Sequence, residues 1–205
     1  MELMKSQWAR VKSFYQEDFH EVLKTSAIAF VVLALAGFAA GMLLPQVAEN
    51  FFDRFLHQIQ DAGIMQDDGS VSAMALFVNN LRAALYTALY GVIPFIFLPA
   101  LSLGLNSLML GLFAAYYIHH GLPVLQYIMG ILPHGIFELP ALVVAVAVGL
   151  YLCRCITDWL RHKTKGVVFP AISDCSRVLL FISVPLLAVA SVVEAYVTPF
   201  IMNLF

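Results

Sequence analysis

Charged residues are scarce in this chain of 205 residues. Asp, Glu, Lys and Arg make up 12% of it, whereas 61% is hydrophobic. An average soluble domain is about 25% charged, so this chain has too little polar surface to cover a soluble globule. Such high hydrophobicity also excludes a disordered chain. No segment has the density of basic and aromatic residues that nucleic-acid binding needs. Three cysteines cannot all pair internally, which excludes a disulfide scaffold.

Long apolar runs predict an all-α, polytopic helical membrane protein in the cell membrane. A transmembrane helix needs about 20 mostly apolar residues. We expect five such helices, over residues 25–44, 73–94, 99–118, 134–153 and 178–198. Pro94 and Pro99 mark a turn between the second and third, because proline breaks the helical hydrogen-bond ladder. Pro133 and nearby glycines interrupt the fourth apolar run, so we expect residues 123–132 to form a re-entrant half-helix.

The basic residues predict the orientation of the chain. Nine of the eleven Lys and Arg residues lie in two segments, 1–24 and 154–177. The loop 46–72 instead carries five acidic residues and one Arg. Because cytoplasmic segments are enriched in Lys and Arg, five spans predict an N-in, C-out topology. Residues 1–24 are then a cytoplasmic amphipathic segment, either on the membrane surface or in solvent. Residues 25–205 form one transmembrane domain with an external loop over 46–72.

A few polar residues fall inside the predicted spans. A charged group at the bilayer centre costs several kcal/mol unless it has a partner. These residues are therefore the predicted intramembrane polar centre: Arg82, His134, Glu138, Glu194, Asn79, Asn80 and Asn106. One hypothesis pairs Arg82 with Glu138 or Glu194, which would fix helix positions without any chemistry.

His134 and Glu138 are four residues apart, so a helix presents them on one face. Such a pair can bind a metal, orient a proton relay or form hydrogen bonds across helices, and the sequence leaves these three open. A metal needs more ligands, which His119, His120 and Glu194 supply only if folding brings them close. We therefore predict no cofactor. The chain has neither a His-Glu-x-x-His nor a Gly-x-Ser-x-Gly motif, and we expect no enzymatic activity.

Gly37 and Gly41 form a Gly-x-x-x-Gly motif in the first predicted span. This spacing lets two helix backbones approach closely. The partner helix is either another span of the same chain or a second copy, and the second reading predicts a homodimer.

Two segments resemble a known family. Residues 133–141, Pro-His-Gly-Ile-Phe-Glu-Leu-Pro-Ala, resemble the signature of the stage II sporulation protein M family of integral membrane proteins, also known as a domain of unknown function. Residues 193–199 resemble its second signature, and the three amides named above fit its pattern. The resemblance covers roughly residues 20–205. It implies a multi-span protein: the member from sporulating bacteria is needed for forespore engulfment and is thought to anchor peptidoglycan-degrading enzymes. Relatives in non-sporulating bacteria and archaea carry the His-Gly-x-x-Glu form present here.

Three functional hypotheses follow. The first is a membrane scaffold or assembly factor whose loop 46–72 contacts extracytoplasmic partners, including wall-modifying enzymes. The second is a small transporter or channel component that uses an intramembrane His/Glu/Arg site, because transporters build substrate sites from broken helices around charged groups. The third is an intramembrane metal site or enzyme.

Overall fold

The computed structural model describes residues 2–61, 71–163, 166–202 and 204 of the chain. Apart from short turns, these residues are helical, which confirms the predicted all-α class. The elements are α1 (Glu2–Phe14), η1 (Tyr15–Phe19), α2 (His20–Leu43), α3 (Pro45–Asp61), α4 (Ala73–Tyr90), α5 (Pro99–His119), α6 (Val124–His162), α7 (Val168–Val178), η2 (Leu179–Ser183), α8 (Val184–Val192), η3 (Val193–Val197) and α9 (Thr198–Met202). The three η elements are π-helical turns within longer helices.

Helix α6 is the centre of the fold. It packs against α2, α4, α5 and the α7–α8 stretch, and all residues of its middle part, 141–149, except Leu142 are buried. This part consists of Ala, Val, Leu and Gly, so neighbouring backbones can approach it closely. A Cβ at Gly149 would lie 2.7 Å from the carbonyl oxygen of Thr87 on α4 and 2.6 Å from Pro99 Cγ on α5. The small residues of α6 therefore set the spacing between three helices.

Four helical stretches of the described chain are long and apolar enough to cross a membrane: α2, α5, α6 and the continuous stretch Val168–Met202. Large apolar side chains on their outer faces, such as Ile28 and Leu35 of α2, are exposed, as expected of helices surrounded by lipid. Helix α4 has 18 residues but is not among the four. The predicted count of five spans is therefore not confirmed and depends on α4.

The predicted re-entrant half-helix over 123–132 is wrong. The structure has one α-helix of 39 residues over Val124–His162, with Pro133 and Pro140 inside it. A proline removes one backbone hydrogen bond and kinks a helix, but neighbouring helices allow a membrane helix to continue through it. The helix is about 58 Å long at 1.5 Å per residue, so it exceeds the bilayer core of about 30 Å.

The Gly-x-x-x-Gly face of α2 is occupied within the chain. A Cβ at Gly37 would lie 2.8 Å from Leu108 Cα on α5, and one at Gly41 would lie 2.6 Å from Ala115 Cβ. Gly111 of α5 is equally tight against the backbone of α2 at Phe38. Gly37 and Gly41 thus lie in the contact between α2 and α5. The homodimer prediction rested on this face, which is not available to a second copy.

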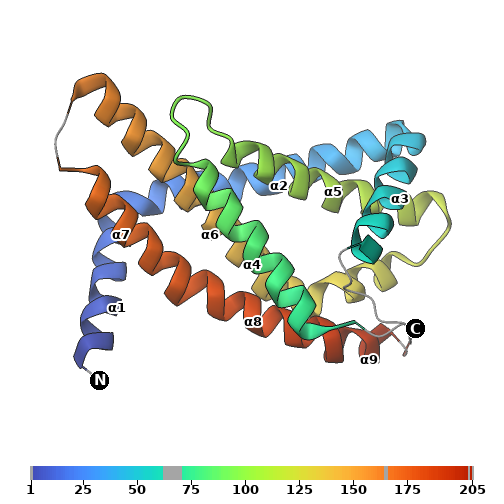
Figure 1. Ribbon diagram of the computed structural model, residues 1–205. Coiled ribbons are helices and arrows are strands. Elements are labelled where there is room, and N and C mark those ends of the chain that lie inside the picture. The colour runs from blue at the N-terminus through green and yellow to red at the C-terminus, as the bar shows by residue number, and fades with distance from the viewer. Residues whose placement is uncertain (1, 62–70, 164–165, 203, 205) are drawn as a thin grey trace.

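The two basic segments meet at one end of the molecule, on the left of Figure 1. There Arg177 Nε donates a 2.6 Å hydrogen bond to Gln7 Oε1, and Arg10 lies 3.9 Å from Asp174. The C-terminal end of α6 lies on the same side (Figure 1). Helices α3 and α9 lie at the opposite end (Figure 1). The predicted external loop thus contains helix α3; its remaining acidic positions, Asp67 and Asp68, lie outside the described residues.

The turn between α4 and α5 is fixed to the C-terminal part of α6. The Phe95 N–H donates a 3.0 Å hydrogen bond to Thr157 Oγ1, and Cys153 Sγ lies 3.3 Å from the Ile93 carbonyl oxygen. The guanidinium of Arg161 sits 5.5 Å above the Phe95 ring. Helix α4 therefore ends beside the basic end of the molecule. The turn falls where Pro94 and Pro99 predict it, and Pro99 starts α5.

Candidate functional site

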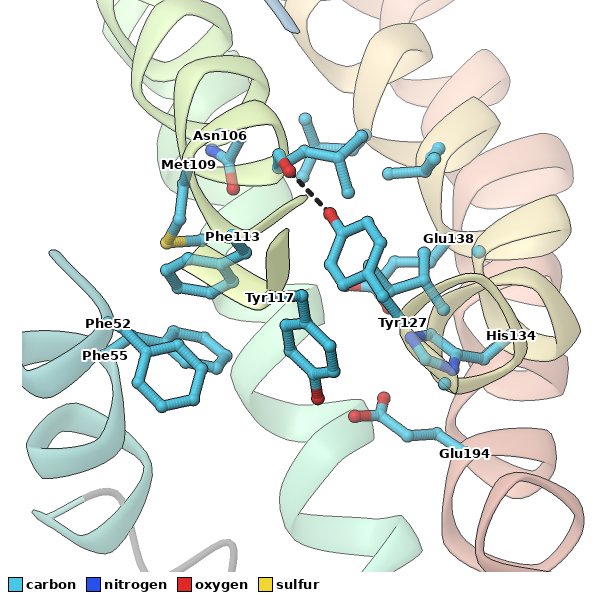
Figure 2. A pocket seen from close by; sticks show the side chains of 16 residues that line it. Phe52, Phe55, Asn106, Met109, Phe113, Tyr117, Tyr127, His134, Glu138 and Glu194 are labelled. Carbon is cyan, nitrogen blue, oxygen red and sulfur yellow. Dashed lines mark hydrogen bonds between the residues drawn. The ribbon is translucent and has the colours of Figure 1, made fainter. Parts of the chain in front are cut away.

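A pocket of about 360 Å³ lies between α3, α5, α6 and η3. Most of its wall is apolar or aromatic, and its polar groups come from three predicted residues, His134, Glu138 and Glu194, together with Asn106 and two tyrosines (Figure 2). Among the described residues that line it there is no Lys or Arg. The pocket is therefore an acidic site within the apolar body of the helices.

The side chains of His134, Glu138 and Glu194 converge in this pocket. One ligand atom from each lies within 4.8 Å of the other two, and all three side chains are half-buried. Within the described part of the chain, these three side chains form no ion pair and no hydrogen bond with one another. The three groups thus face a shared gap and do not neutralise one another directly.

The sequence explains how two helices build this cluster. His134 and Glu138 lie one helical turn apart on α6 and point the same way, as their spacing predicts. Glu194 comes from η3, where a π-turn interrupts the α-helical register of the C-terminal stretch. Single π-turns within α-helices are frequent at functional sites because they redirect a side chain. Glu194 therefore faces α6 from the neighbouring helix.

Thr198 orients the ring of His134. The hydroxyl of Thr198 donates its hydrogen to the Val193 carbonyl oxygen at 3.4 Å, and His134 Nδ1 lies 3.3 Å from the same hydroxyl oxygen. If the hydroxyl hydrogen is used in this way, the hydroxyl accepts from His134 and Nδ1 carries the ring proton. The lone pair of Nε2 is then free to bind a ligand.

Aromatic side chains close the pocket on the side of α3. Phe52 stacks on Tyr116 with ring centroids 4.1 Å apart, and Phe55 packs 5.0 Å from Phe113. On the α6 side, the Tyr127 ring lies 5.2 Å from that of Tyr117. Helix α3, predicted only as part of an external loop, is thus a wall of the site.

Two carboxylates this close repel each other strongly when both are charged. At 4.8 Å and an effective dielectric constant of about 20, the repulsion is about 3.5 kcal/mol. With no Lys or Arg in the described lining, a cation in the gap is the simplest compensation. The cluster is suited to holding a proton or a metal ion between the carboxylates.

The other predicted site residues are distributed differently. Asn106 lines the pocket, and its amide donates a 2.8 Å hydrogen bond to the Ser102 carbonyl of its own helix. Arg82 is exposed on α4 and, among the described carboxylates, pairs with neither Glu138 nor Glu194. The hypothesis of an Arg82 ion pair is therefore wrong.

Four further candidates also lie apart from the cluster. Asn79 and Asn80 contact each other at 3.4 Å on α4 and do not line the pocket. His119 contacts the Gly41 carbonyl and His120 the Tyr116 carbonyl. Neither histidine therefore joins the cluster of His134 and Glu138. Of the three further ligands that the sequence offered, only Glu194 joins it.

Sequence reasoning missed Tyr127, Thr198 and the two phenylalanines of α3. Tyr127 had a usable signal: it precedes His134 by seven residues, which is two turns of one continuous helix. The predicted break at Pro133 hid that relationship. Phe52 and Phe55 had no comparable signal, because they reach the pocket only through the packing of α3 on α5.

The fold and the pocket define an all-helical membrane protein with a polar site between its helices. Its relatives identify it further. The family described as Stage II sporulation protein M matches residues 26–199, and the chain belongs to that family. This confirms the resemblance seen in the two signature segments, which contain His134, Glu138 and Glu194.

Two uncharacterised proteins of Methanocaldococcus jannaschii are similar to the chain. One is 26% identical over 156 residues, which cover 74% of this chain and 68% of the relative. The other is 29% identical over 126 residues, which cover 61% of this chain and 70% of the relative. No solved structure matches the chain.

Proposed function

We propose that the chain is a small membrane transport component that takes a cation, either a proton or a metal ion, into the pocket between α5, α6 and η3. The observation that carries this proposal is the convergence of His134, Glu138 and Glu194 within 4.8 Å. A purely structural cluster would pair its charges directly, whereas these three groups leave a gap. Of the two main sequence hypotheses, this geometry favours transport over a scaffold.

The helices around the pocket support the proposal. Prolines 133 and 140 bracket the His134–Glu138 turn within α6, and η3 interrupts the facing helix at Glu194. Each proline removes one backbone hydrogen bond from the continuous helix α6, and single π-turns are frequent at functional sites. Both helices therefore have weakened backbone hydrogen bonding beside the site, which would allow them to change shape while a cation enters or leaves.

Flux through liposomes tests this function. The purified chain is reconstituted with a pH-sensitive dye or a metal-sensitive dye inside the vesicles, and a proton or divalent-metal gradient is applied. Glu138→Gln and Glu194→Gln keep the size of the side chain and remove its negative charge, so each should abolish the flux. Glu49→Gln on the exposed face of α3 is the matched control and should retain it. Absence of both fluxes in the unaltered chain, or a flux in both pocket variants as large as in the unaltered chain, would overturn the proposal.

A scaffold role is a second candidate, favoured by the polar surface of α3. One face of this helix packs on α5 through Phe52 and Phe55, while Glu49, Asp53 and Gln58 are exposed. If the basic end faces the cytoplasm, this surface faces the outside of the cell and is free for a protein partner, such as the wall-modifying enzymes that the family resemblance implies.

Photo-crosslinking in intact cells tests the scaffold role. A photoreactive residue at Asp53 should yield a discrete protein adduct, and one at exposed Lys12 at the opposite end should not. The same adducts from both positions, or none from Asp53, would count against a scaffold.

A further inference from the structure

We infer that the pocket binds one divalent first-row transition-metal ion through His134, Glu138 and Glu194. This inference rests on the proposed function and names the cation. It depends on four features: the type of donor atoms, the orientation of the histidine, the spacing of the three groups and the charge of the site.

The donor atoms fit a transition metal better than other cations. Imidazole nitrogen together with carboxylate oxygen is a common set for Zn²⁺, Mn²⁺, Fe²⁺ and Co²⁺. Mg²⁺ and Ca²⁺ prefer oxygen ligands alone, and for them His134 would be a poor ligand. Within the described residues, the pocket offers this mixed set only at His134, Glu138 and Glu194.

His134 is oriented as in known metal sites. A metal-binding histidine usually donates its second ring N–H to a nearby acceptor, which fixes the ring and leaves the other nitrogen free for the metal. The hydroxyl oxygen of Thr198 lies 3.3 Å from His134 Nδ1 and is placed to be such an acceptor. Thr198 is buried and is held in turn by the Val193 carbonyl. The neutral ring therefore offers the Nε2 lone pair as a ligand.

The spacing of the three groups leaves room for an ion. Metal–ligand bonds of about 2.0–2.2 Å place the donor atoms of a tetrahedral site about 3.3–3.6 Å apart. The donor atoms here lie within 4.8 Å of one another, so modest rotations of the side chains bring them to that distance. Three protein ligands also leave a coordination position open, and the pocket of about 360 Å³ has space for water or an exchanging ligand there.

The charge of the site matches a divalent ion. Glu138 and Glu194 supply two negative charges and neutral His134 supplies none. A divalent cation therefore makes the site electrically neutral within the apolar helices, where an uncompensated charge costs several kcal/mol. Protons give the same neutrality only if both carboxylates are protonated.

Metal binding to the full-length chain in detergent tests the inference. Co²⁺ is titrated into the metal-free protein and followed by its visible absorption, and bound metal is counted by elemental analysis. We expect one Co²⁺ per chain, displaced by Zn²⁺ but not by an excess of Mg²⁺. Loss of one ligand in His134→Gln, Glu138→Gln or Glu194→Gln should weaken binding at least as much as loss of a group that only orients a ligand, which costs roughly tenfold or more. His57→Gln and Glu49→Gln, on the exposed face of α3, should bind normally.

The outcomes separate this inference from the proposed transport function. No saturable Co²⁺ or Zn²⁺ binding up to millimolar concentration overturns the inference, and so does binding that is equal in all variants. Proton flux without metal binding retains the transport function and rejects the metal. Metal binding without any flux retains the metal site and rejects transport. Gel filtration and a melting curve of each variant identify any that do not fold, and the Glu→Gln variants are the least perturbing in shape.

Discussion

The hydroxyl of Tyr127 donates a hydrogen bond to the backbone carbonyl of Leu110, which joins the first turn of α6 to the middle of α5 (Figure 2). The bond spans the wall of the pocket, so it holds one side of the candidate site in place. Tyr127→Phe removes the bond and keeps the ring. We expect a loss of about 1 kcal/mol in the free energy of unfolding, measured by thermal unfolding in detergent micelles.

A tyrosine outside the pocket provides the control for this change. Tyr86 is exposed on α4, and Tyr86→Phe should leave the unfolding temperature unchanged. Equal effects of the two substitutions would show that the bond to Leu110 contributes nothing to stability.

The contact between α2 and α5 should tolerate no side chain at its glycines. Gly37→Ala places a methyl group 2.8 Å from Leu108 Cα, so the helices must separate. Overpacking of this kind costs typically about 1–3 kcal/mol. Gly104→Ala on the same helix pair meets no atom within 4 Å and should be neutral or stabilising by up to about 1 kcal/mol. Chemical unfolding in mixed micelles compares them, and a Gly37→Ala variant as stable as Gly104→Ala would contradict the packing described.

The hydroxyl of Thr198 should matter for ligand binding more than for folding. Thr198→Val keeps the shape of the side chain but removes the acceptor for His134 Nδ1, so the ring loses its fixed orientation. Changes of this kind in known sites weaken metal binding by roughly 10–100-fold. Thr198→Ser restores the hydroxyl and should restore the affinity. Co²⁺ titration of the two variants measures the difference, and identical affinities would exclude an orienting role.

The path of α4 makes a prediction about topology. The turn after α4 is bonded to the C-terminal part of α6 through Phe95 and Thr157, beside the basic end. If that end faces the cytoplasm, a cysteine at Ile96 and one at Lys12 should react with a membrane-impermeant thiol reagent only after the cells are opened. A cysteine at Asp53 on α3 should react in intact cells.

Because the native Cys153, Cys155 and Cys175 also react with such reagents when accessible, the labelling needs a background without them. If Ile96→Cys is labelled together with Asp53→Cys in intact cells, α4 does not cross the membrane and the predicted five spans are reduced to four.

The sequence predicts most helices well because their signals are local. The apolar length of 25–44 corresponds to α2, which starts at His20, and Pro99 marks the start of α5. The continuity of α6 could not be predicted, because Pro133 is equally compatible with a helix start and with a kink. Only the packing of the neighbouring helices, which the sequence does not display, decides between them.

The candidate site likewise has a part that local sequence spacing predicts and a part that depends on helix packing. The face shared by His134 and Glu138 follows from their spacing alone. Glu194 joins them from a helix 56 positions further along the chain, and its approach depends on the packing of two helices. Arg82 looked equally unusual within an apolar run, but α4 turns it to the outside. An unexpected charge in a hydrophobic sequence thus indicates a candidate, whereas tertiary structure selects among the candidates.

The π-turn that contains Glu194 has an evolutionary consequence. A π-turn accommodates one residue more than an α-helical turn does and absorbs it locally. Deleting one residue within Val193–Val197 would therefore restore a regular helix and leave the helical segments before and after it in nearly their present orientation. Only the side chains of the turn itself would be redirected, so Glu194 would no longer face His134 as it does now. A single codon gained or lost at this position is therefore enough to create or destroy the site without shortening the helix appreciably.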